Sequence, residues 1–83
     1  MKINLQITYD GGVAKEITAN AADMVAFETK FNIPVSNLSS DPRMSYLFFL
    51  GYSAEKRTGA TKETFEKWLE TVELVGAGDT DPK

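Results

Sequence analysis

The chain has 83 residues, of which 42% are hydrophobic and 25% charged, and its formal net charge is −3. This size and composition indicate one small folded domain, and the weakly acidic balance argues against a nucleic-acid partner. The sequence contains no Cys and no His, which excludes disulfides and thiolate nucleophiles and removes the usual general base. We therefore expect no enzyme, no metal site and no cofactor.

The chain begins with an expected β-hairpin. Apolar residues occupy every second position of its first strand, namely Ile3, Leu5, Ile7 and Tyr9, as in a strand with one buried face. A three-residue loop at 10–12 aligns the apolar residues of the two strands, whereas a two-residue loop sets Leu5 against Glu16. We favour the three-residue loop, which places Lys15 opposite Ile7 on the apolar face.

A helix is expected over 21–31. Asn20 is a suitable N-cap, and Asp23 brings a negative charge to the first turn, where it suits the helix dipole. The inward face of this helix is predicted to carry Met24, Phe27 and Phe31. Ile33-Pro34 ends it, because the residue before a proline is disfavoured in the helical region.

A central helix is expected over 42–57, beginning at Asp41-Pro42, with an acidic cap before a proline at the first helical position. At 100° per residue, one stripe is predicted to face the core. It contains Met44, Leu47, Phe48, Gly51 and Ala54, with Leu50 at its margin. Lys56 and Arg57 suit the C-terminal end of the helix dipole.

Three aromatic residues of the central helix, Tyr46, Phe49 and Tyr52, project away from that stripe. Either a second element covers these rings or a protein partner does. Exposed aromatic side chains grouped on one helix are typical anchors of a protein interface. They are therefore candidate protein-binding residues.

A third helix is expected over 62–74, because Phe65, Trp68, Leu69 and Val72 follow helical spacing. Trp68 fits a core position better than an interface, but it is kept as a fourth candidate protein-binding residue. Residues 76–83 have no apolar periodicity and are expected to form a flexible tail.

Together these patterns predict an α+β fold: an N-terminal β-hairpin over 2–19, followed by three helices packed as a small helical domain. The domain is expected to span residues 1–75. No apolar run approaches the length that crosses a bilayer, and the N-terminus has no signal-peptide pattern. We therefore expect a soluble protein without a membrane partner.

The order of these signals resembles the tail assembly chaperones of long-tailed bacteriophages. The resemblance extends from about Ala21 to Leu74. It is carried by Asp23-Met24-Val25-Ala26-Phe27-Glu28, Phe31-Asn32-Ile33-Pro34, Asp41-Pro42-Arg43, Leu47-Phe48-Phe49-Leu50 and Phe65-Glu66-Lys67-Trp68-Leu69.

The resemblance implies a short, non-frameshifted form, or its shared domain, that binds the tape measure protein and keeps it soluble during tail morphogenesis. A longer frameshifted form would recruit tail tube subunits through its extension. The same resemblance implies action in the host-cell cytoplasm and absence from the mature virion. The net charge of only −3 departs from the strong negative charge expected of a coating protein. Self-association is left open.

One alternative remains at this point. The chain would then be a small regulatory or inhibitor protein of a phage or mobile element. It would bind one folded partner through the same aromatic residues or through the hairpin edge. A one-to-one interface would favour this alternative over multivalent coating.

Overall fold

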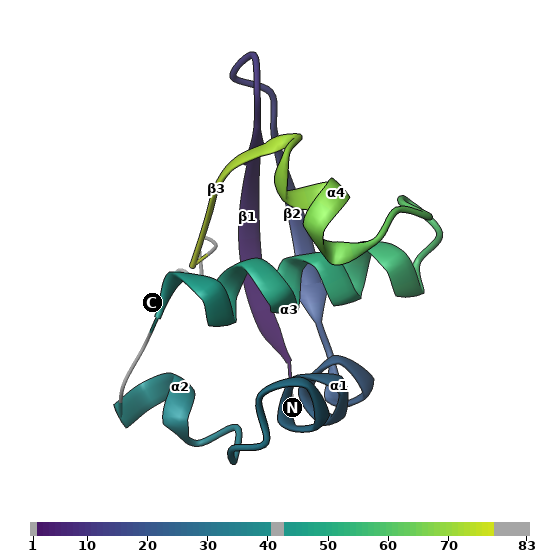
Figure 1. Cartoon of the computed structure of the whole chain (residues 1–83). Coiled ribbons are helices and arrows are strands. Elements are labelled where there is room, and N and C mark those ends of the chain that lie inside the picture. Colours follow the sequence, from purple (N-terminus) through teal and green to yellow (C-terminus); the bar gives the residue numbers. More distant parts are fainter. Residues whose placement is uncertain (1, 41–42, 78–83) are drawn as a thin grey trace.

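The computed structural model describes residues 2–40 and 43–77, which form an α+β fold in which a long helix crosses one face of an antiparallel sheet (Figure 1). The elements are β1 (Ile3–Tyr9), β2 (Ala14–Ala19), α1 (Ala21–Phe31), α2 (Asn37–Ser40), α3 (Met44–Arg57), α4 (Phe65–Leu69) and β3 (Val72–Ala77). The strand order is β2-β1-β3, so that β1 is central. α3 crosses the sheet and packs against each of these strands.

The N-terminal hairpin has the predicted register. Leu5 lies opposite Ile17, and Ile7 lies opposite Lys15. The Tyr9 amide donates to the Val13 carbonyl at 2.8 Å across the loop at 10–12. Both loop glycines have positive φ, a region that costs glycine little. The three-residue loop is thus confirmed.

Helix α1 begins and ends as predicted. The Asn20 side chain accepts from the backbone of Ala22 and Asp23, while the Asp23 carboxylate accepts from the Asn20 amide at 2.9 Å. This reciprocal pair is a capping box. Asn32 ends the helix in the left-handed conformation, with φ of 58°. Met24 and Phe27 are buried and Phe31 is half-buried.

The predicted third helix over 62–74 is wrong in extent and partly in type. The helix stops at Leu69, and the chain continues as strand β3, which pairs with β1. Val72 lies opposite Tyr9 and Val75 opposite Ile7, because the register shifts between Thr8 and Tyr9. This bulge turns Val72 and Val75 to the core although they are three residues apart. Bulged strand and helix therefore give the same apolar spacing.

Strand β3 also corrects two related predictions. The domain does not end at residue 75, because Gly76 and Ala77 belong to β3; the remainder of the expected tail lies outside the described residues. The predicted packing of three helices after the hairpin is also corrected, because α3 packs on the three strands as well as on α1 and α4. The short helix α2 lies between the two helices expected over 21–31 and 42–57, where no helix was predicted.

The predicted core stripe of α3 is confirmed at its C-terminal end and wrong at its start. Gly51 and Ala54 are buried, and Leu50 is fully buried rather than marginal. Leu47 and Phe48 are half-buried, and Met44 is 48% exposed. A Cβ at Gly51 would lie 3.4 Å from Ile7 Cδ1, which shows how closely α3 approaches β1. The expected helix start at Asp41-Pro42 lies outside the described residues.

Candidate functional site

The four candidate binding residues lie in a continuous cluster of aromatic rings. Phe49, Tyr52 and Trp68 are only 8%, 7% and 2% exposed, and Tyr46 is half-buried. Of the two alternatives for these rings, cover by other elements of the chain therefore holds for Phe49 and Tyr52, and the core position preferred for Trp68 is confirmed.

Rings from the neighbouring helices cover α3. Phe31 of α1 and Phe65 of α4 contact the Phe49 ring edge-on, with centroids 5.7 and 5.5 Å away. Tyr46 makes similar edge contacts with Phe27 and Phe31. Such edge-to-face pairs are favourable beyond the area that they bury. Two other elements of the same chain, α1 and α4, thus cover most of the ring surface that a partner could have covered.

This cover is incomplete between α1 and α3, where an open groove of about 420 Å³ remains. We call it the α1–α3 groove. It is lined by Ala26, Phe49, Tyr52, Ser53, Lys56 and Arg57. Because α1 presents the small side chain of Ala26 here, Phe49 and Tyr52 form an apolar floor. The lining contains two cations and no carboxylate.

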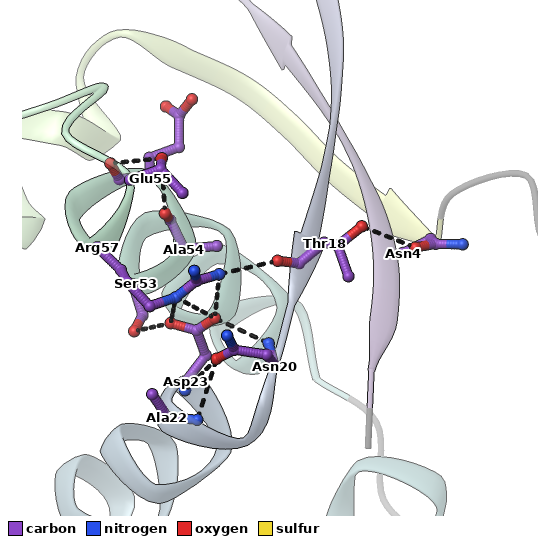
Figure 2. A network of polar contacts seen from close by, with 10 residues as sticks. Asn4, Thr18, Asn20, Ala22, Asp23, Ser53, Ala54, Glu55 and Arg57 are labelled. Atoms are coloured by element: carbon purple, nitrogen blue, oxygen red, sulfur yellow. Dashed lines mark hydrogen bonds and ion pairs between the residues drawn. The ribbon is translucent and has the colours of Figure 1, made fainter.

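An ion pair between the buried Asp23 carboxylate and the partly exposed Arg57 guanidinium holds the two walls of the groove together (Figure 2). The Asp23 carboxylate of α1 is 1% exposed; it accepts from Ser53 Oγ at 2.7 Å and from Arg57 Nη2 at 3.0 Å. The same guanidinium donates to the carbonyl of Thr18 at 3.1 Å. Asp23 therefore does more than complement the helix dipole. It fixes α1 against α3 and the end of β2.

Two lysines stand over the aromatic rings at this side of the molecule. Lys56 Nζ lies 5.8 Å from the centroid of Tyr52, and Lys30 Nζ lies 5.6 Å from that of Phe65. These distances fit cation–π contacts. Across residues 2–40 and 43–77, neither lysine forms an ion pair. The aromatic surface therefore has cations beside it that a partner could neutralise.

The opposite side of α3 carries a second buried carboxylate, Glu55, which faces the sheet. Tyr9 Oη and Trp68 Nε1 donate to Glu55 Oε1, the latter at 3.0 Å, and Lys15 Nζ donates to Oε2 at 2.7 Å. Burial alone would raise the pKa of Glu55, but these hydrogen bonds outweigh burial and lower it. Burial and then the Glu55 contact raise the pKa of Tyr9.

The Glu55 cluster stabilises the fold and has no open position for a substrate. Glu55 is 2% exposed, and three donors already occupy its oxygens. Sequence reasoning missed this carboxylate. Lys15 could have indicated it, because a cation on an apolar sheet face is usually paired with an acidic side chain.

A second depression lies at the end of α1, with a volume of about 320 Å³ and Glu28, Asn32, Ile33 and Pro34 around it. The Glu28 carboxylate accepts from the Val35 amide at 2.7 Å. It thereby holds the turn after the helix. This depression has a smaller volume than the α1–α3 groove.

Comparisons with known proteins identify no relative of this chain. No family model, curated protein sequence or solved structure matches the chain. The described helices are all too short to cross a membrane. No cluster of three acidic side chains that could hold a metal ion occurs in the described ranges.

Proposed function

We propose that this protein is a bacteriophage tail assembly chaperone that binds the tape measure protein and keeps it soluble during tail morphogenesis. The observation that carries the proposal is the α1–α3 groove, in which an apolar floor lies open between two helices. Amphipathic helices are commonly bound in such grooves.

The sequence resemblance supports the same function. Phe27, Phe31, Phe49 and Trp68, which belong to the resembling motifs, are also the rings that build the cluster beneath the groove. In this proposal the chain is the short form, acts in the host-cell cytoplasm without catalysis and is absent from the mature virion. A longer frameshifted form would add the contact with tail tube subunits.

The structure changes which substitution can test the proposal. Phe49→Asp would place a charge among packed rings and unfold the domain, so loss of binding would not be informative. Ala26→Glu fills the groove from its rim, where the side chain is half-buried. Val25→Glu is the matched control, because Val25 is the neighbouring residue of α1, is 62% exposed and does not line the groove.

The test is co-expression with the tape measure protein of the same genome, followed by size-exclusion chromatography with light scattering. We expect the wild type and Val25→Glu to form a soluble complex with several copies of this chain per tape measure protein. We expect Ala26→Glu to remain folded by circular dichroism and to leave the tape measure protein insoluble. An insoluble tape measure protein beside the free wild-type chain would contradict the proposed function.

The alternative, a small regulatory or inhibitor protein with one folded partner, is favoured by a different observation. β2 lies at an edge of the sheet, and its side chains are mostly exposed. A partner strand could pair with that edge. A one-to-one complex that Ala26→Glu leaves intact would support this alternative.

A further inference from the structure

We infer that the α1–α3 groove selects an amphipathic helix whose apolar stripe is flanked by acidic side chains. This inference rests on the proposed function and specifies the chemistry of the partner segment. The floor supplied by Phe49 and Tyr52 fits the apolar stripe, and the cations beside it fit the flanking acids.

The shape of the groove favours a helix. Its walls are two helices whose relative position is fixed by the Asp23–Arg57 ion pair, so the groove exists before a partner arrives. A helix that packs between them can insert apolar side chains from successive turns, as ridges into grooves. A preformed groove also avoids the free-energy cost of ordering the binding surface.

The charge of the groove favours acidic flanks. The chain carries a net charge of −3, yet Lys56 and Arg57 line the groove and Lys30 stands over Phe65 beyond it. Arg57 is already paired with Asp23, whereas Lys56 and Lys30 form no ion pair within the described parts of the chain. Carboxylates on a bound helix would pair with these lysines, and basic flanks would be repelled.

The probes are two designed peptides of about 18 residues, because shorter isolated helices are marginal in water. Both carry the same leucine stripe at helical spacing. One has Glu on each side of the stripe and the other has Lys. Fluorescence anisotropy of the labelled peptides measures their affinity for the full chain. We expect the Glu-flanked peptide to bind at least roughly tenfold more tightly, with a difference that shrinks as salt is added.

Variants of the chain locate the binding site. Ala26→Glu should abolish binding of the Glu-flanked peptide, and Lys56→Glu should weaken it by roughly fivefold or more. Lys67→Glu is the charge-matched control; Lys67 is an exposed residue of α4 outside the groove lining, and its substitution should leave affinity unchanged.

Equal binding of the two peptides, or binding that Ala26→Glu does not alter, would overturn the inference. So would a concentration-dependent dimer that Ala26→Glu abolishes, because a second copy of the chain would then occupy the groove. The outcome is separable from the proposed function. A soluble tape measure complex without peptide selectivity overturns only the inference, whereas selective peptide binding beside an insoluble tape measure protein overturns only the proposed function.

Discussion

The two sides of α3 are buried in different ways. Towards the sheet, Gly51 lets the helix approach Ile7 and Trp68 closely, and the Glu55 carboxylate is saturated by three donors. Towards α1 and α4, the rings of Phe49 and Tyr52 are covered mainly by other aromatic residues. That cover ends at Ala26, where the groove opens.

This difference separates stability from the proposed binding. The sheet side has no open position and depends on a buried charge whose partners are all within the chain. The groove side has an apolar floor and two lysines that form no ion pair within the described chain. Substitutions on the sheet side should therefore lower the free energy of unfolding, whereas substitutions at the groove rim should affect binding.

The largest effect is expected for Glu55→Ala. The substitution leaves the hydroxyl of half-buried Tyr9 and the indole N–H of buried Trp68 without their acceptor, while the Lys15 ammonium can turn to water. We expect the free energy of unfolding to fall by about 3 kcal/mol. Urea denaturation measures it, with Glu16→Ala, an exposed acid on β2, as a control expected within about 0.5 kcal/mol of wild type. A Glu55→Ala variant with the same free energy of unfolding as wild type would refute the structural role of the cluster.

Asp23→Ala is expected to cost about 2 kcal/mol, because it removes both the capping box and the Arg57 ion pair. The loss is smaller than at Glu55, since the Arg57 side chain is 34% exposed and can become hydrated. Asp23→Asn keeps an oxygen acceptor and should lose less. Urea denaturation of both variants gives the ranking. Faster hydrogen exchange in α1 should accompany the loss of stability. An Asp23→Asn variant as stable as wild type would contradict the role of the charge.

The pH dependence of stability offers a smaller test of the sheet side. Because the folded state lowers the pKa of Glu55 below its ordinary value of 4.5, its contribution is present above that value and is lost as pH falls through the lower, folded pKa. Lys15→Met removes a partner that lowers this pKa, so the loss should begin at higher pH. At pH 7 the variant should be about 1 kcal/mol less stable, a modest figure because Lys15 is 44% exposed.

Acid titrations followed by Trp68 fluorescence measure this shift, since the indole N–H donates directly to Glu55. Lys67→Met, which removes an exposed lysine of α4, is the control. Superimposable acid transitions for wild type and Lys15→Met would show that Lys15 does not set the pKa of Glu55.

The smallest effect is expected for Gly51→Ala, which should raise the free energy of unfolding by less than about 1 kcal/mol. Alanine is the better helix former, and its Cβ would meet Ile7 and Trp68 at ordinary contact distances of 3.4 to 3.5 Å. Gly51→Val should be destabilising, because its extra carbons would overlap these side chains. Thermal denaturation compares the two; a destabilised Gly51→Ala would mean that α3 cannot tolerate even one carbon towards β1.

Local signals allowed the hairpin register and α1 to be predicted. The pairing of Leu5 with Ile17 follows from alternation and loop length, and the Asn20 cap follows from residue type. β3 could not be recognised because its bulge gives Val72 and Val75 a helical spacing. In such a stretch, pairing with β1 determines whether the chain forms a strand or a helix, and β1 is distant in sequence.

The candidate site was predictable only in part. Projection of α3 correctly separated two faces, but it could not show that Phe31 and Phe65 cover Phe49. It also could not show where that cover ends. The groove depends on Ala26 of a different helix, a residue with no distinctive signal of its own.

Hydrogen exchange of the co-expressed tape measure complex, compared with the free chain, tests most directly whether the groove side of α3 is the binding side. The account predicts new protection in α1 around Ala26 and in the stretch of α3 from Phe49 to Arg57, with β2 unchanged. Protection that follows the β2 edge and leaves α1 unchanged would contradict it.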